Sequence, residues 1–456
     1  MAARKKRVLT PEEQLEAALV PESEWPYEVP ENWCWVRLGS CVSKSTTKSN
    51  TNDSNVLYIG LENFESGAGI TSYADASGTK SVKSVFYPGQ ILYGRLRPYL
   101  NKHDVAKVEG VCSTDILVYE ASGCVEAQYV NLFLDTKEFI EHSVGHSKGI
   151  NLPRVSPTEI EAAFFPLPPL HEQRRIASRI EWLFSKLDAA ETVLRKVVDG
   201  SEQRQVAILH RALDGGITKS WRVQNSVSKS ATWKECRLID ALKGKPRNGY
   251  SPKPVDYETS VKNLVLTAVT SGTFKPEYFK YIDEEIPDES HLWLMPGDIL
   301  LQRSNSLEKV GTSALYTGGP REFIYPDLMM KLQVNNAAYA PFIAYQLKTF
   351  NVMNYLRTNA TGTAGNMPKV NQVTVSNIPI VLPSYQEQIE IAGSLDLLLT
   401  KEMTFANAAS AVLYDLKKIR RIILSRALRG ELGTNDTNEP SSKELLANIL
   451  SGNAGK

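Results

Sequence analysis

The strongest constraint on the fold is an internal repeat in which equivalent residues lie 215 positions apart. Asn151-Leu-Pro-Arg-Val155 corresponds to Asn366-Met-Pro-Lys-Val370, and Ile208-Leu-x-Arg-Ala-Leu213 corresponds to Ile423-Leu-x-Arg-Ala-Leu428. Three shorter pairs keep the same spacing: Leu167-Pro168 with Leu382-Pro383, Glu172-Gln173 with Glu387-Gln388, and Ile176-Ala177 with Ile391-Ala392. About sixty positions align without a gap, so the chain consists of two related halves.

The earlier part of each half is less alike. Arg37-Leu38, behind Trp33 and Trp35, corresponds to Arg237-Leu238 behind Trp233 at an offset of 200. Pro88-Gly-x-Ile-Leu92 corresponds to Pro296-Gly-x-Ile-Leu300 at an offset of 208. The changing offset indicates insertions, so each half has a variable first part and a faithful second part.

The faithful parts, 166–216 and 381–430, are each predicted to form one long helix. Pro168-Pro169 and Pro383 lie near the starts of these segments, and Gly215-Gly216 and Gly430 lie at their ends, as at helix boundaries. In each segment, mostly apolar residues recur in alternating steps of four and three residues, which is heptad spacing. These positions are Ile176, Ile180, Leu183, Leu187, Ala190, Leu194, Val197, Ser201, Arg204 and Ile208, and then Ile391, Leu395, Leu398, Glu402, Phe405, Ala409, Val412, Leu416, Ile419 and Ile423. A helix of about 42 residues is roughly 63 Å long.

We expect the two helices to pair in one antiparallel two-helix coiled coil, because two repeats related by a two-fold axis present equivalent helices in opposite directions. Polar positions in one helix, such as Arg204, correspond to apolar positions in the other. The alternative is that each amphipathic helix packs only on its own domain.

The variable parts, 28–165 and 233–380, are predicted to be α+β domains. Helical stretches are expected near Val130–Val144 and Phe342–Arg357, and Gly, Pro, Asn and Ser separate short β-rich runs. These runs are Val56–Ile59, Gln90–Tyr93, Ile116–Tyr119, Leu264–Leu266 and Asp298–Leu301. We interpret 1–27 as an N-terminal arm, 217–232 as a Ser-rich linker and 431–456 as a C-terminal tail with a short helix near Lys443–Leu450.

Composition limits the other possibilities. No apolar run reaches the roughly 18 residues of a membrane helix, and no apolar segment follows the basic stretch Arg4–Arg7 as in a secretory signal. The five cysteines are scattered without a Cys-x-x-Cys pair, which favours reduced thiols in a cytoplasmic protein. Net charge is only +1, so a nucleic-acid surface would have to be local or completed by other subunits.

No catalytic constellation is expected. An adenine methyltransferase would need an Asn- or Asp-Pro-Pro-aromatic motif, but the only Pro-Pro pair is Pro168-Pro169, and there is no phosphate loop. Gly362–Gly365 is too short for a dinucleotide fingerprint. His142 and His146 are four residues apart, but Ser143 stands where a zinc hydrolase has Glu, so we expect no metal site.

Each variable part has two loops suited to DNA contacts. The first loop follows the Pro-Gly-x-Ile-Leu run, and its Arg, Asn and Gln side chains match the hydrogen-bonding edges of guanine and adenine. The second loop precedes the repeated Pro, and its Gly and Lys or Arg residues suit phosphates. The candidate contacts are Arg95, Arg97, Asn101, Lys102, Lys148, Arg154, Gln302, Arg303, Asn305, Lys309, Thr361 and Lys369.

Simpler interpretations stand beside these candidates. Arg95, Arg97 and Arg303 could merely solvate a turn. Asn151 and Asn366, which recur in both halves, are better explained as turn formers than as readers of different bases. A basic helix face near the C-terminus could meet phosphates or an acidic partner, although an exposed face is the default. Its members are Lys417, Lys418, Arg420, Arg421, Arg426 and Arg429.

The order and duplication of these motifs resemble the specificity subunits of type I restriction-modification systems. The resemblance covers nearly the whole chain. It rests on Val29-Pro-Glu-Asn-Trp33-x-Trp35-Val-Arg-Leu38, on Leu167-Pro-Pro-Leu-His-Glu-Gln173 and Leu382-Pro-Ser-Tyr-Gln-Glu-Gln388, and on the Arg-Ala-Leu-x-Gly that closes each helix. It implies two target-recognition domains, each reading half of a bipartite site in double-stranded DNA, separated by the helices.

The resemblance also implies partners. Two modification subunits would bind S-adenosylmethionine and methylate adenine, and two restriction subunits would add ATP- and Mg-dependent translocation and cleavage. No cofactor is expected in this chain, which would be a non-catalytic subunit. The first loops differ in almost every residue, so the two half-sites should differ. There are two alternatives to this function. A coiled-coil scaffold with two ligand-binding domains fits the helices, whereas a self-contained methyltransferase lacks a cofactor loop.

Overall fold

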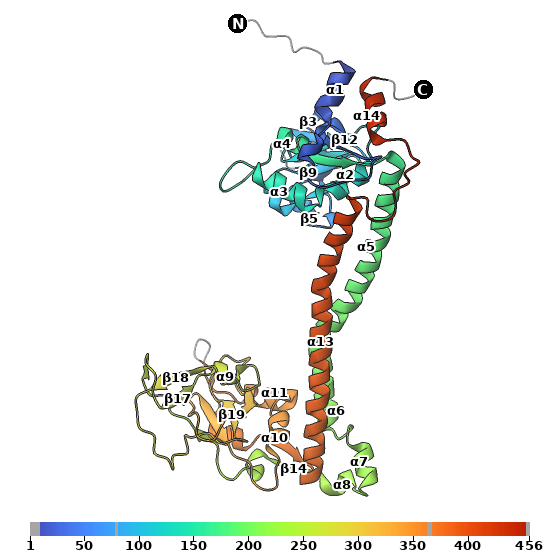
Figure 1. Cartoon of the computed structure of the whole chain (residues 1–456). Coiled ribbons are helices and arrows are strands. Elements are labelled where there is room, and N and C mark those ends of the chain that lie inside the picture. Colours follow the sequence, from blue (N-terminus) through green and yellow to red (C-terminus); the bar gives the residue numbers. More distant parts are fainter. Residues whose placement is uncertain (1–9, 78–80, 363–366, 453–456) are drawn as a thin grey trace. The chain divides into compact units, whose positions relative to one another are not determined.

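The structure is a computed structural model of the chain, and it describes residues 10–77, 81–362 and 367–452. It divides into two compact units. The first unit comprises the residues up to Leu194 and those from Ala411 onward, and the second comprises Arg195–Ser410. Both boundaries lie inside long helices, so each unit contains one globular domain and a stretch of both helices (Figure 1).

The first domain lies between strands β1 (Cys34–Arg37) and β13 (Phe164–Leu167), which pair antiparallel. Between them are a four-stranded sheet, β10-β9-β12-β2, and a five-stranded sheet, β3-β8-β11-β4-β7. The strands are β2 (Val42–Lys44), β3 (Lys48–Ser49), β4 (Leu57–Ile59), β7 (Ala74–Asp75), β8 (Lys83–Phe86), β9 (Ile91–Gly94), β10 (His103–Val105), β11 (Gly110–Cys112) and β12 (Ile116–Ala121). A two-stranded ribbon, β5 (Phe64–Glu65) with β6 (Gly69–Ile70), and helices α2 (Ala127–Leu134), α3 (Lys137–Gly145) and α4 (Pro157–Glu161) complete the domain.

The second domain repeats this plan between β14 (Lys234–Arg237) and β22 (Pro379–Leu382), which pair in the same way. Its sheets are β15-β21-β19-β20 and β16-β18-β17. The strands are β15 (Arg247–Asn248), β16 (Pro254–Val255), β17 (Val261–Leu264), β18 (Phe279–Ile282), β19 (Ile299–Gln302), β20 (Ser313–Leu315) and β21 (Met329–Leu332). The helices are α9 (Thr267–Thr270), α10 (Ala340–Gln346), α11 (Phe350–Thr358) and α12 (Gln372–Ser376). The predicted α+β class is therefore confirmed.

Most of the predicted strands and domain helices are present. The apolar runs around Val56, Gln90, Ile116 and Asp298 became β4, β9, β12 and β19, because short β-rich segments between turn residues favour strands. The prediction for Leu264–Leu266 was wrong: β17 ends at Leu264, and the chain then enters α9. An apolar run this short does not distinguish a strand end from a helix start.

The long helices are α5 (Leu170–Asp199), α6 (Ser201–Leu213) and α13 (Tyr385–Ala427). The sequence predicted one helix per half, but Gly200 interrupts the first, whereas its counterpart Asp415 lies within the uninterrupted α13. Glycine in a helix interior costs about 1 kcal/mol relative to alanine. The chain continues in a helical direction, because the amide of Arg204 still donates to the carbonyl of Gly200 at 3.1 Å.

In the first unit, α5 and α13 pack antiparallel. Near the start of α5, Ile176 and Ile180 share a buried core with Leu424 near the end of α13. Farther along α5, Phe184 and Asp188 contact Arg420, which comes earlier in α13. Contacts closer to the C-terminal end of α5 are therefore made with residues closer to the N-terminal end of α13.

In the second unit, α6 and α13 also pack antiparallel. Arg204 Nη2 lies 2.8 Å from Glu402 Oε1, and Ala212, later in α6, shares the core with Leu395, earlier in α13. Arg204 and Glu402 both occupy heptad positions, so two of the three polar residues that interrupt the apolar pattern pair with each other.

The heptad pattern predicted too wide an apolar face on α13. Ala409 and Leu416 are buried as expected, but Phe405 is 56% exposed and Val412 is 46% exposed. Leu398 and Ile419 are exposed as well. A pair of helices buries only a narrow stripe of each, so apolar residues beside the stripe stay in contact with solvent.

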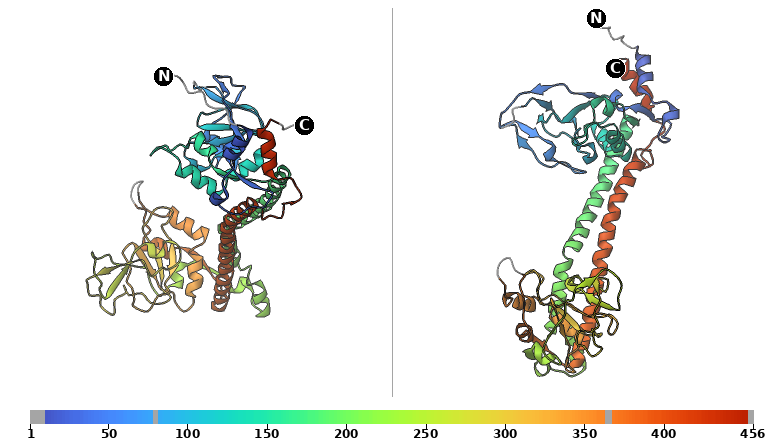
Figure 2. Two further views of the ribbon diagram at one scale, coloured as in Figure 1. Left: turned by 45° about the horizontal axis from the view of Figure 1, so that its top comes forward. Right: turned by 90° about the vertical axis from the view of Figure 1, so that its left-hand side faces the viewer.

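The segments interpreted as linker and tail have defined structure. Residues 217–232 contain α7 (Lys219–Gln224) and α8 (Lys229–Thr232). In the first unit, α14 (Ser442–Leu450) lies beside α1 (Pro11–Ala18) (Figure 2). Ser442 Oγ donates to the carbonyl of Leu167 at 2.7 Å, and Leu446 is buried in the core of the first domain.

Over the described residues, no helix is long and apolar enough to cross a bilayer.

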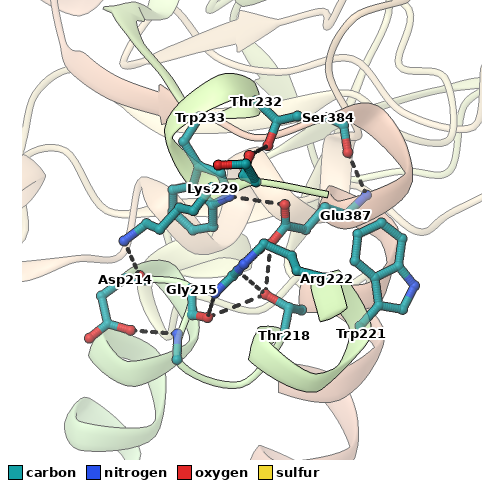
Figure 3. Close-up of polar contacts among 12 residues, drawn as sticks. Asp214, Gly215, Thr218, Trp221, Arg222, Lys229, Thr232, Trp233, Ser384 and Glu387 are labelled. Carbon is teal, nitrogen blue, oxygen red and sulfur yellow. Dashed lines mark hydrogen bonds and ion pairs between the residues drawn. The ribbon is translucent and has the colours of Figure 1, made fainter. Parts of the chain in front are cut away.

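The repeated Glu-Gln motif joins each long helix to its domain. Glu387 is fully buried and accepts hydrogen bonds from Trp233 Nε1 at 2.9 Å, Thr218 Oγ1 at 2.8 Å and Arg222 Nη1 at 2.5 Å (Figure 3). Glu172 accepts from Trp33 Nε1 at 2.8 Å and from Thr434 Oγ1 at 3.3 Å.

The adjacent glutamines complete the same joint. The side-chain amide of Gln173 donates to the carbonyls of Cys124 and Pro168, each at 2.9 Å, and its carbonyl accepts from the amide of Glu126. Gln388 makes the equivalent bonds to Ala337, Pro383 and Tyr339. The repeated motif is thus a structural joint.

We predict that Arg222→Ala destabilises the second unit by about 3–5 kcal/mol, because it leaves the buried Glu387 carboxylate without its cation. Denaturant unfolding, with hydrogen exchange to assign the change to the second unit, measures this effect. The control is Asp288→Ala, which removes an exposed pair with Arg321 in the same unit and should cost less than about 1 kcal/mol. Equal effects of the two substitutions would contradict the assignment.

Candidate nucleic-acid interface

The two candidate loops of the first domain meet at backbone hydrogen bonds. One loop connects β9 to β10, and the other forms a hairpin between α3 and α4. The amide of Arg97 donates to the carbonyl of Pro153 at 2.7 Å, and the amide of Val155 donates to the carbonyl of Arg95 at 3.1 Å. Segments more than fifty residues apart in sequence therefore form one surface.

The second domain repeats this junction. The amide of Val370 donates to the carbonyl of Arg303 at 2.8 Å, and the amide of Asn305 donates to the carbonyl of Pro368 at 3.4 Å. Arg303 and Asn305 correspond to Arg95 and Arg97 at the offset of 208, while Pro368 and Val370 correspond at the offset of 215. The backbone frame of the site is therefore the same in both domains, although the side chains differ.

Arg95 and Arg303 occupy equivalent positions at the two junctions. Both side chains are half-buried, and in each the Nε atom is buried without a hydrogen-bond partner among the residues that the structure describes. Arg303 Nη1 makes one long bond, 3.5 Å, to the carbonyl of Asp327. A buried donor without a partner costs roughly 1–3 kcal/mol, so both guanidinium groups would gain from an acceptor on a ligand.

Three predicted contact residues are instead bonded within the protein. Asn101 is buried and donates to Asp135 Oδ1 at 3.0 Å. Lys102 Nζ donates to the carbonyl of Leu61 at 2.6 Å. Gln302 is fully buried and donates to the carbonyl of Leu266 and the hydroxyl of Thr270. These side chains shape the loops by bonding inward.

Six further candidates lie at the surface and differ in their exposure and in their hydrogen bonds. Arg97, Lys148, Lys309 and Lys369 are exposed. Thr361 is exposed as well, and its hydroxyl makes a 3.3 Å bond to the carbonyl of Lys369. Asn305 is half-buried and donates to Gln302 Oε1 at 2.8 Å.

Arg154 is paired, and sequence reasoning missed its partner. Its Nε and Nη2 atoms donate to the two carboxylate oxygens of Asp115 at 2.8 and 3.0 Å. This hydrogen bonding holds the pKa of Asp115 below its ordinary value. The pair fixes the base of the hairpin, so Arg154 acts on the geometry of the loop. No local pattern in the sequence links residues so far apart.

A buried histidine supports the first loop. His103 Nδ1 lies 2.7 Å from Asn131 Oδ1, and its Nε2 lies 3.1 Å from Asp135 Oδ1. Burial alone would lower the pKa of His103, but the hydrogen bond and charge of Asp135, with smaller contributions from Asn131 and Asp104, raise it above 6.5. Two of the partners of His103, Asn131 in α2 and Asp135 just after it, are distant in sequence, so no local pattern links them to the loop.

The histidine pair considered as a metal motif is arranged differently. His142 Nε2 bonds to the carbonyl of Glu159 at 2.7 Å, and the rings of His142 and His146 lie with centroids 4.4 Å apart. Within 10–77, 81–362 and 367–452, no group of three or more His, Cys, Asp or Glu side chains is placed to hold a metal ion.

Comparison with known proteins agrees with this duplicated architecture. Residues 232–409 match the family described as the type I restriction modification DNA specificity domain. The EcoDI specificity subunit of Escherichia coli is 28% identical over 219 residues, which cover 47% of this chain and 49% of that protein. The EcoKI specificity subunit of Escherichia coli strain K12 is 24% identical over 291 residues, covering 63% of this chain and 61% of that protein. These alignments thus span about half to three-fifths of the relatives.

The fold is that of solved type I subunits. The HsdS subunit from Thermoanaerobacter tengcongensis superposes with a TM-score of 0.65 at 19% identity, covering 90% of this chain and 100% of that one. A chain from a study of complex assembly and conformational transition of the type I R-M system gives 0.69, also at 19% identity, with 89% and 100% covered. The fold is thus that of a duplicated, two-domain protein. Residues 232–409 thus form a type I restriction modification DNA specificity domain, and the chain is similar to type I restriction-modification specificity subunits.

We predict that His103 makes the stability of the first unit depend on pH. Because folding raises the pKa of His103, its contribution is complete below about pH 6.5 and is lost as pH rises through the folded pKa. The stability difference between the native chain and His103→Asn should therefore shrink between about pH 5.5 and about pH 8. Urea unfolding at each pH measures it, with the exposed His291 replaced in His291→Asn as the control. A constant difference would rule out the assignment.

Proposed function

We propose that this chain is the DNA-recognition subunit of a type I restriction-modification complex. In this proposal each domain reads one half of a bipartite site in double-stranded DNA, and the chain positions the subunits that methylate and cleave. The observation that supports it most directly is the duplicated junction, where an arginine with an unpartnered Nε lies at the same position in both domains. Arginine pairs with guanine through two hydrogen bonds in the major groove, so this residue type at this place suits base recognition.

The two half-sites are proposed to differ. On the common backbone frame the first domain presents Arg97 and Lys148, whereas the second presents Asn305, Lys309 and Lys369. Different donors and acceptors select different base edges. An asymmetric site follows, and the reading domains are proposed to be 28–165 and 233–380.

The partners are proposed to be two modification subunits, which carry S-adenosylmethionine, and two restriction subunits, which use ATP and Mg²⁺. We propose that the modification subunits dock on the long helices, where large apolar side chains remain exposed. These side chains are Trp182, Leu397, Met403, Phe405, Tyr414 and Ile422. A net charge of +1 is also low for a protein that binds phosphates alone, which supports contacts to DNA from partners.

Methylation mapping of a genome with and without this gene tests the proposed function. We expect an asymmetric, bipartite adenine-methylated motif that disappears with the gene. An unchanged methylation map, while the chain still binds an unrelated protein or sugar, would favour a scaffold instead.

We predict that Arg95→Ala and Arg303→Ala each relax one half-site. Loss of a bidentate contact to guanine costs about 1–3 kcal/mol at the affected position and leaves the other half-site intact. Binding of the complex to duplexes altered at single positions measures the change. A uniform loss across all sequences would indicate that these arginines contact phosphates.

We further propose that the helices 166–216 and 381–430 set the distance between half-sites. Removing seven residues from each, between the facing pairs Asp188–Arg420 and Arg204–Glu402, shortens each by about 10.5 Å, or roughly three base pairs. The methylated motif should then keep both half-sites and lose about three base pairs of gap. An unchanged gap in the methylation map would count against a spacer role.

A further inference from the structure

We propose that Ile150 reads the 5-methyl group of a thymine in the half-site bound by the first domain. This inference rests on the proposed function. Ile150 lies at the tip of the hairpin between α3 and α4 and is 99% exposed, and Leu152 beside it is 47% exposed. Figure 1 shows this loop extending away from the rest of the first domain. The tip therefore packs on nothing within its own domain.

The hairpin is held firmly at its base although its tip is free. The amide of Lys148 donates to the carbonyl of Arg154 and the reverse bond also forms, each at 2.9 Å. Gly149 has φ +109°, a conformation that side chains rarely adopt, and it allows the turn just after Lys148. The Arg154–Asp115 pair and the Arg97–Pro153 bond fix the hairpin to the domain. Its direction is thus set before any ligand binds.

The surroundings of Ile150 indicate the chemistry of its ligand. Lys148 and Arg97 are exposed cations close to it in the hairpin and in the adjoining loop, so the ligand carries negative charge. A two-stranded β-ribbon fits the major groove of DNA, and the thymine methyl is the apolar group presented there. A protein partner would need a wider apolar surface than Ile150 and the half-exposed Leu152 provide. An exposed branched aliphatic side chain beside cations therefore fits a methyl in the groove.

The second domain lacks an equivalent residue. Its hairpin is longer, since the base pairing joins Thr361 to Lys369 where the first joins Lys148 to Arg154. Residues 363–366, with the sequence Thr-Ala-Gly-Asn, lie outside the described residues, and this sequence contains no branched aliphatic residue. Thymine-methyl recognition by this route should be confined to the first half-site.

Replacing thymine by uracil, which removes only the methyl group, tests the proposal. The full chain is purified with its modification subunit, and the site is taken from the methylation map. At one thymine of the first half-site, uracil should weaken binding about fourfold, the effect of burying one methyl group. Ile150→Ala should bind the thymine duplex about as weakly, and uracil should weaken it no further. Val82→Ala, which alters an exposed valine elsewhere in the first domain, should keep the full thymine preference.

The outcomes separate this inference from the proposed function. Complexes that show no sequence preference would overturn the proposed function itself. If the site is recognised but contains no thymine in that half, or if Ile150→Ala keeps the thymine preference, the role of Ile150 is overturned. Equal weakening on every sequence would indicate a backbone contact, and loss of the modification subunit from Ile150→Ala would indicate a protein contact. Either result would also overturn it.

Discussion

The buried glutamate at the start of each long helix is the interaction on which both units depend. Glu172 joins three parts of the first unit: its own helix, the strand region of Trp33, and the segment of Thr434 that follows α13. Glu387 does the same in the second unit with Trp233 and the segment that follows α6. A buried carboxylate is tolerated only with such partners, so it holds the domain, the helix and the returning chain in one arrangement.

A rigid joint of this kind allows the loops to vary. In both domains the same backbone hydrogen bonds connect the loop after β9 or β19 to the following hairpin, although most side chains of the first loop differ. The main chain thus fixes the geometry of the loops, and the side chains make the two domains differ. Buried polar groups such as Gln302 fill the space beneath the loop and keep its shape. This division is what a protein needs if its two domains read different sequences.

Sequence reasoning predicted what repeats or is periodic, and missed what depends on distant contacts. The 215-residue spacing gave the long helices, and short apolar runs gave β4, β9, β12 and β19. The candidate loops were located, but nothing in the sequence showed that they meet, or that Asn101, Lys102 and Gln302 bond inward. Heptad spacing also placed Phe405 inside, because periodicity identifies a face without showing how much of it a partner covers. Whether the candidate residues contact DNA stays a prediction.

The energetics of the two arginines explain how a nearly neutral chain could still discriminate between sequences. An unpartnered, buried Nε weakens the free protein, and a correct base edge would relieve that cost, whereas a wrong base would leave it in place. The difference between right and wrong sequences would then exceed what the direct contact alone provides, because discrimination depends on the penalty as well as on the attraction. Phosphate contacts raise affinity for every sequence alike. In the proposed function, a subunit that leaves most of those contacts to its partners and keeps unsatisfied donors at the loops proposed to face bases favours specificity over affinity.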